Sequence, residues 1–145
     1  MLGNLVTWLR MLDYDTAYAR DLDDKDIIKL AEAEQRIILT RDEGLAMDAK
    51  KRRINYYLLR SLRTREQIIE LHSALNINLE PKMQRCSLCN ASIRHVVPED
   101  LETIKSKEYV PKNIDYKELW LCTVCGQVYW EGGHWKKIRE TLKIK

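Results

Sequence analysis

Four cysteines form the most specific pattern in this sequence. They stand as two Cys-x-x-Cys pairs separated by 32 residues, Cys86 with Cys89 and Cys122 with Cys125. The residues that directly follow the pairs are asparagine and glycine, which both tolerate the tight turn of a zinc-binding knuckle. Two such pairs can present four thiolates in a tetrahedron, the geometry of structural zinc. We predict a closed, structural zinc site, with two redox pairs or four unrelated buried thiols as the alternatives.

Aspartates near the N-terminus could hold a different metal. Residues 13–26 contain six of them, and Asp42 comes two residues after a predicted strand. Ligands of open parallel sheets bind beyond the carboxyl ends of the strands, so we expect Asp21, Asp23 and Asp24 to share one sheet edge with Asp42. Carboxylates gathered there repel one another unless a divalent cation intervenes. Magnesium or manganese, held by a few carboxylates and waters, could activate a water against a phosphodiester.

A structural interpretation of the same aspartates is also open. Asp23 or Asp24 could cap one helix and Asp42 the next, because a carboxylate accepts hydrogen bonds from the free N–H groups of a helix start. For Asp13 and Asp15, a solvated turn is the favoured interpretation.

Positive charge is concentrated in two segments, although the chain as a whole carries only +3. Residues 50–65 hold seven cations and no acid, and residues 135–145 hold five against a single glutamate. Clustered Lys and Arg with Tyr and Trp nearby suit a phosphate backbone and unstacked bases; a solvated face is the alternative. The predicted RNA-binding residues are Lys50, Lys51, Arg52, Arg53, Arg60, Arg63, Arg65, Lys136 and Lys137.

Aromatic residues surround the second cysteine pair. Trp120 precedes it, and Tyr129, Trp130 and Trp135 follow it. They could stack bases, but aromatic residues of this kind more often fill the small core of a zinc ribbon. We favour the core interpretation for Trp120 and Trp130.

The elements that must position these residues alternate along the first part of the chain. Hydrophobic spacing and capping signals predict helices over 2–12, 24–35, 43–50 and 64–75, and strands over 16–19, 36–40 and 54–59. This alternation is typical of a parallel α/β sheet. The pattern then changes to short strand-like pieces, a short helix over 99–105 and a basic helix over 135–145. We therefore expect an α/β domain over 1–82 and a zinc ribbon over 83–145.

Composition sets the class of protein. The 145 residues are 45% hydrophobic and 32% charged, with only 5 Gly and 3 Pro, which excludes a disordered or collagen-like chain. No apolar stretch approaches the roughly 20 residues of a membrane span. The N-terminus has no basic region before its apolar stretch, so it does not fit a signal peptide. We expect a cytoplasmic protein, in which disulfides are disfavoured.

The residues also resemble a known family, the Mut-seven C-terminal RNase domain. The resemblance is carried by Met1-Leu2-Gly3, Trp8-Leu9-Arg10 and Tyr14-Asp15, and then by Leu22-Asp23-Asp24 and Leu39-Thr40-Arg41-Asp42. It continues through the ribbon, in Arg85-Cys86, Cys89, Trp120, Cys122, Cys125, Val128-Tyr129-Trp130 and Gly133-His134-Trp135.

The resemblance implies a fold and an activity. The fold is PIN-like, a three-layer parallel sheet with helices on both faces, followed by a four-cysteine zinc ribbon. The activity is RNA cleavage that depends on magnesium or manganese. Asp24 and Asp42 match the family's acidic positions, with Asp23 and Asp26 as close neighbours. The implied partner is RNA, with ribosomal RNA as one candidate. The alternative is an inactive RNA- or ribosome-binding zinc-ribbon protein.

One departure from the family pattern bears on this choice. Members normally begin with a strand that ends in an aspartate just before the Met-Leu-Gly segment, and here the sequence starts at Met1. Either the start is set too late, or this is a degenerate member that binds RNA without cutting it. We favour the first explanation, because a sheet without its central strand would have unpaired edges.

Overall fold

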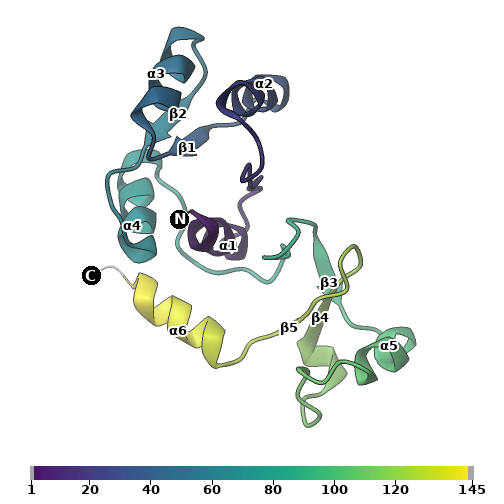
Figure 1. Cartoon of the computed structure of the whole chain (residues 1–145). Coiled ribbons are helices and arrows are strands. Elements are labelled where there is room, and N and C mark those ends of the chain that lie inside the picture. The colour runs from purple at the N-terminus through teal and green to yellow at the C-terminus, as the bar shows by residue number, and fades with distance from the viewer. Residues whose placement is uncertain (1, 144–145) are drawn as a thin grey trace. The chain divides into compact units, whose positions relative to one another are not determined.

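The computed structural model describes residues 2–143, which divide into two compact units (Figure 1). We call residues 18–74 the inserted unit, and residues 2–17 together with 75–143 the cysteine unit. This division differs from the predicted boundary at residue 82, because the first helix makes its contacts with the segment that holds the cysteines. The domain ranges 1–82 and 83–145 stay a prediction.

The inserted unit contains the predicted alternation of helices and strands. Its elements are α2 (Asp24–Glu34), β1 (Ile38–Thr40), α3 (Glu43–Lys51), β2 (Tyr56–Leu58) and α4 (Thr64–Leu75), the last of which ends at the unit's boundary. The strands pair in parallel, with Ile38 opposite Tyr56 and Thr40 opposite Leu58. Both strands are shorter than predicted, and β2 is only partly buried.

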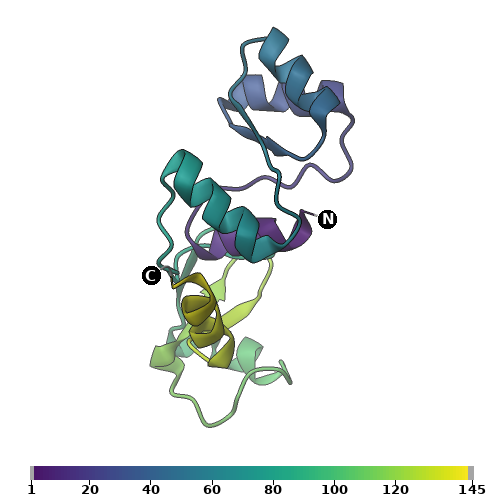
Figure 2. The same cartoon turned by 90° about the vertical axis from the view of Figure 1, so that its left-hand side faces the viewer.

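An apolar cluster holds this unit together. Helices α2 and α3 lie on one side of the strand pair in both views (Figures 1 and 2). Ile28 of α2, Ile38 of β1 and Ala49 of α3 are buried in the same cluster. The opposite face carries Tyr57, whose hydroxyl donates to Glu70 of α4 at 3.0 Å. Helices therefore contact both faces of the pair.

The predicted three-layer parallel sheet is not confirmed. Within residues 2–143 the parallel sheet has two strands. The predicted strand over 16–19 is wrong, because this segment is irregular. Its backbone bonds with side chains instead of with a neighbouring strand: the N–H of Thr16 donates to Asn90 Oδ1, and the carbonyl of Thr16 accepts from Arg10 Nε, both at 3.0 Å. The observed class is a mixed α/β chain.

The cysteine unit is built on a second, antiparallel sheet. Strands β3 (Ile93–His95), β4 (Leu119–Cys122) and β5 (Val128–Trp130) lie in the order β3-β4-β5. The helical elements are α1 (Gly3–Met11), the 3-10 helices η1 (Pro98–Asp100) and η2 (Tyr116–Glu118), α5 (Leu101–Lys105) and α6 (Gly133–Leu142). The predicted C-terminal helix is present, and its last two predicted residues lie outside the described ones.

The small core of the ribbon lies on one face of this sheet. It contains Leu119, Leu121 and Val128 together with Ile104 of α5. Trp130 packs against this cluster, as the core interpretation expected. Trp120 does not, because side chains alternate along a strand and its neighbours Leu119 and Leu121 occupy the core face.

Helix length also bears on the membrane prediction. Across residues 2–143, none of the helices is both long and apolar enough to cross a bilayer.

Candidate metal centre and nucleic-acid surfaces

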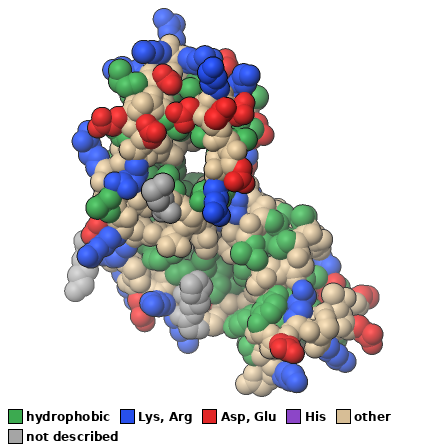
Figure 3. Space-filling view, viewed as in Figure 1, with side chains coloured by type: hydrophobic (Ala, Val, Ile, Leu, Met, Phe, Trp, Pro, Cys, Tyr) green, Lys and Arg blue, Asp and Glu red, His purple; other side chains and the backbone are tan. Residues whose placement is uncertain are grey.

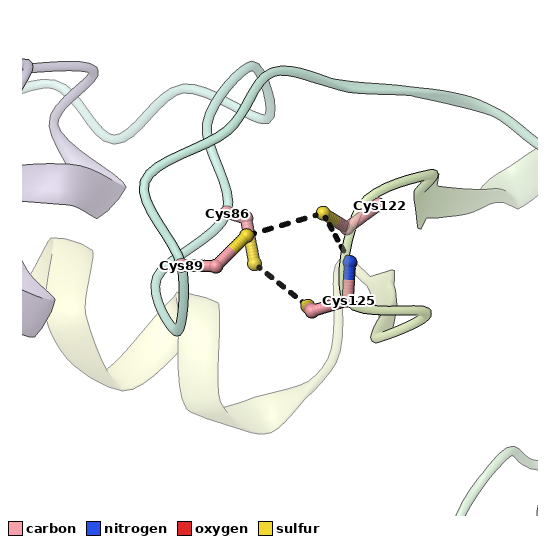
Figure 4. A group of neighbouring side chains, drawn as sticks. All are labelled: Cys86, Cys89, Cys122 and Cys125. Atoms are coloured by element: carbon pink, nitrogen blue, oxygen red, sulfur yellow. Dashed lines mark hydrogen bonds between the residues drawn. The ribbon is translucent and has the colours of Figure 1, made fainter.

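The structure brings the four cysteines together. Figure 4 shows their side chains converging from two turns. All four Sγ atoms lie within 4.8 Å of one another; Cys86 and Cys125 are separated by 3.6 Å, and Cys89 and Cys122 by 3.5 Å. A tetrahedral zinc ion with Zn–S bonds of about 2.3 Å places its sulfurs about 3.8 Å apart. The arrangement therefore fits a zinc ion held by all four thiolates.

The two turns that carry the cysteines share one backbone geometry. Asn90 and Gly126 both have positive φ, 73° and 82°. The N–H of Asn90 donates to the carbonyl of Cys86 at 3.0 Å, and the N–H of Gly126 donates to that of Cys122 at 2.9 Å. The two positions are therefore equivalent, as the residue types after each cysteine pair predicted.

Local hydrogen bonds prepare one thiol for metal. Burial acts to raise the pKa of Cys122, but the N–H groups of Cys125 and Val124 near its sulfur outweigh burial and lower the pKa to about 7. Burial raises the pKa of Cys89. Metal ligation requires the thiolate, so these N–H groups favour the form of Cys122 that binds a metal ion.

Arg10 connects helix α1 to the first cysteine turn. Its side chain is almost fully buried, with 8% of the residue exposed. The guanidinium donates from Nη1 to the carbonyls of Ser87 and Leu88, at 3.1 and 3.0 Å, and from Nε to the carbonyl of Thr16. Burial lowers its pKa, while the nearby Cys86 and Cys89 act to raise it. A zinc ion with four thiolates is net negative, so this cation offsets the charge of the filled site.

Tyr129 contacts the same turn from strand β5. Its hydroxyl lies 3.0 Å from Cys86 Sγ and accepts from the N–H of Ser87 at 3.1 Å. Burial and the hydrogen bond with Cys86 raise the pKa of Tyr129, so the phenol keeps its proton. Spacing alone did not reveal Arg10 or Tyr129 as neighbours of the metal site. The available signal for Arg10 was an arginine interrupting the apolar face of a helix.

The predicted catalytic aspartates lie at two helix starts. Asp23 caps α2 by accepting from the N–H of Asp26 at 2.8 Å. Asp42 follows β1 and caps α3 by accepting from the N–H groups of Gly44 and Leu45, at 2.7 and 3.2 Å. The capping interpretation is therefore confirmed for Asp23 and Asp42. Asp24 lies in the first turn of α2, and so does Asp26.

These aspartates do not form a cluster. All four are exposed. The four cysteines are the one group of three or more potential metal-ligating side chains found over residues 2–143. The expected convergence of aspartates into such a group is thus absent from the described part of the chain. The catalytic role of Asp23, Asp24, Asp26 and Asp42 stays a prediction.

The predicted RNA-binding cations are all exposed. Lys50 and Lys51 end helix α3, and Arg52 and Arg53 after them line a cavity of about 430 Å³ together with Arg36. Figure 3 shows Lys and Arg side chains over the end of the inserted unit that holds α3. Lys136 and Lys137 lie on α6 of the cysteine unit.

The carboxylate of Glu70 fixes the turn before α4, which carries the predicted RNA-binding residues Arg60 and Arg63. This carboxylate accepts from the backbone N–H groups of Arg60 and Ser61, at 2.9 and 3.0 Å. Burial acts to raise the pKa of Glu70, but these hydrogen bonds outweigh it and the pKa is lowered. The carboxylate thus stays charged, and it holds the segment between Arg60 and α4 in place.

The described residues form a mixed α/β protein with four cysteines positioned to bind a metal ion. Comparison with family models matches the Mut7-C RNAse domain over residues 1–142. The chain therefore belongs to the Mut7-C RNAse domain family. Searches of curated proteins and of solved structures find no match.

Proposed function

We propose that this protein is a ribonuclease of PIN-like type that uses a divalent cation, with the four-cysteine site as a structural zinc centre. Membership of an RNase domain family along essentially the whole chain carries the proposal. The position of Asp42 supports it, because this residue lies just beyond the carboxyl end of β1, where ligands of parallel sheets bind.

Asp24 and Asp42 are the residues we assign to magnesium or manganese, with Asp23 and Asp26 beside them. Magnesium is often bound by one or two carboxylates, with waters and substrate phosphates completing its shell, so the proposal does not require three clustered acids. The ion would supply charge stabilisation at the phosphate and an activated water. The exposed cations of residues 50–65 and of α6 would hold the RNA backbone.

The test is cleavage of labelled RNA with manganese by the wild type and by Asp42→Asn. Asparagine caps a helix as well as aspartate does, so this substitution removes the charge and keeps the start of α3. We expect cleavage to be lost and RNA binding to be retained. Asp48→Asn is the matched control, because Asp48 is another exposed acid of the same helix. Equal cleavage by wild type and Asp42→Asn would refute the site.

A second candidate function is RNA or ribosome binding without cleavage. The dispersed, exposed aspartates of the described residues favour it. It predicts salt-sensitive binding that weakens when Arg52 and Arg53 are both changed to Glu. Changing the exposed Arg20 and Lys29 to Glu alters the net charge equally outside the basic segment. RNA binding that changed neither with the salt concentration nor with the charge reversals at Arg52 and Arg53 would exclude this function.

A further inference from the structure

We infer that a pocket at one end of the ribbon sheet binds a base of single-stranded RNA. The pocket has a volume of about 280 Å³ and is lined by Ile114, Lys117, Glu118, Trp120, Trp130 and Glu131. The inference rests on the proposed interaction with RNA, and it assigns a role in base recognition to the ribbon. None of these six residues belongs to the predicted catalytic or RNA-binding sets.

The two tryptophans that line the pocket lie at one end of the β4–β5 ladder, on opposite faces of the sheet. Leu119 and Trp130 form the last pair of the β4–β5 ladder, next to the pair of Trp120 and Tyr129. The turn with Cys125 lies at the other end of the same ladder, between β4 and β5. The pocket is thus built on strands that the zinc site holds together, but it is separate from the zinc site.

Trp120 is a half-buried indole that the core does not use. It lies on the sheet face opposite Leu119 and Leu121 and outside the core cluster. The ring of His95 on the neighbouring strand lies against it, with ring centroids 4.7 Å apart. Aromatic rings presented in this way are the usual stacking partners of unpaired bases, since every base has a π-face.

Trp130 is held in place by the ribbon core, against which it packs, and by the ring of Tyr109, with ring centroids 6.3 Å apart. A Cβ on Gly132 would lie 2.8 Å from Nε1 of the Trp130 indole. Only glycine therefore lets the ring lie this close to the backbone. Trp130 thus borders the pocket from the core side of the sheet, whereas Trp120 borders it from the other face.

The charges around the pocket favour a base over a phosphate. The lining has one cation, Lys117, and two carboxylates, Glu118 and Glu131. Glu131 also lies 3.7 Å from Arg139. The two carboxylates disfavour an anion but can accept hydrogen bonds from the amino group of a base. The basic segment 50–65, in contrast, suits the phosphate backbone.

The test measures equilibrium binding of a labelled oligoadenylate and of an abasic oligonucleotide with the same sugar-phosphate chain. Divalent cations are left out, so that binding is measured without cleavage. Replacing Trp120 with Ala should weaken binding of the oligoadenylate about tenfold, the usual cost of losing one stacking contact. Binding of the abasic chain should not change. Trp120→Phe should lose less, because the smaller ring still stacks.

Tyr18→Ala is the control, because Tyr18 is an exposed aromatic residue outside the pocket. Trp120→Phe also keeps the inference testable if the alanine variant does not fold, which its zinc content would reveal. Three outcomes would overturn the inference: no oligoadenylate binding by the wild type, equal binding of both oligonucleotides, or no base-dependent loss in the Trp120 variants. RNA cleavage is measured in a separate experiment. A protein without nuclease activity could therefore still show base binding, and a protein without base binding could still show nuclease activity.

Discussion

Arg10 shows how a single buried cation can support a metal site that it does not ligate. Its guanidinium holds the carbonyls of Ser87 and Leu88 inside the first cysteine turn. Loss of such an outer-shell partner typically weakens metal affinity 10- to 100-fold. We expect this loss of zinc affinity in Arg10→Gln. The loss should be smaller in Arg10→Lys, which keeps the charge but lacks the guanidinium that donates to several carbonyls at once.

Competition for zinc with a coloured chelator measures this effect. Arg20→Gln is the control, because Arg20 is an exposed arginine outside the cysteine unit. Unchanged zinc affinity in Arg10→Gln would show that the turn keeps its shape without the guanidinium.

Asp100 is a second residue whose charge stabilises the cysteine unit. Its carboxylate accepts two hydrogen bonds from Arg94, at 2.8 and 3.0 Å, and one from the N–H of Val97. The bonds from Arg94 and then Val97 lower the pKa of Asp100 from 3.8 to about 2. Because the pKa of Asp100 is lower in the folded state, the ionised carboxylate stabilises the fold at pH values above its unfolded pKa of 3.8. This stabilisation is lost as the pH falls toward 2.

Asp100→Ala should therefore lower the free energy of unfolding by about 1 kcal/mol, the typical net contribution of one hydrogen bond. The deficit should stay constant between about pH 5 and pH 8, because Asp100 is ionised throughout in both states. Urea unfolding with zinc present measures it, with Glu99→Ala as the neighbouring control. A deficit that changed with pH across this range would contradict the assignment.

At the scale of an element, the left-handed turns decide whether the cysteine pairs can face a metal. Gly126 has φ of 82°, which is costly for alanine by roughly 1–2 kcal/mol. Gly126→Ala should reduce zinc affinity, whereas Gly126→Asn should be tolerated, because Asn90 occupies the equivalent position of the first turn. Zinc competition separates the two variants. Equal effects of Ala and Asn would mean that the conformation of this turn is not what limits metal binding.

At the scale of the whole molecule, the cysteine site and the apolar cluster around Ile38 lie in different units. The cysteine turns belong to residues 2–17 and 75–143, while the cluster around Ile38 belongs entirely to residues 18–74. Removing zinc with a chelator should therefore disorder the cysteine unit first, because structural zinc contributes directly to folding free energy. We expect amide NMR signals of β3–β5 to move or vanish, while those of α2 and α3 persist.

Elemental analysis of the same sample checks the stoichiometry, which we expect to be one zinc per chain. Simultaneous loss of signals from both units would show that they unfold as one cooperative body. Protein that contained no zinc when purified without chelator would overturn the metal centre itself.

The sequence alone determined the features that depend on local spacing and residue type. The two Cys-x-x-Cys pairs, the turn residues behind them and the helices over 24–35, 43–50 and 64–75 were predicted because each follows from neighbouring residues. The capping role of Asp42 was weighed on the same local grounds. Family membership also followed from motifs spread along nearly the whole chain.

Only the tertiary structure decided how distant segments pair. Residues 16–19 look like a strand locally, but their backbone is bound by Arg10 and by Asn90, which lies 74 residues further along the chain from Thr16. Trp120 was predicted to be a core residue from its residue type, but the register of β4 places it on the face of the sheet opposite the core. Each outcome depends on which remote partner satisfies a buried polar group or covers an apolar face. Sequence spacing does not encode that choice, because contacts between distant segments form only when the chain folds.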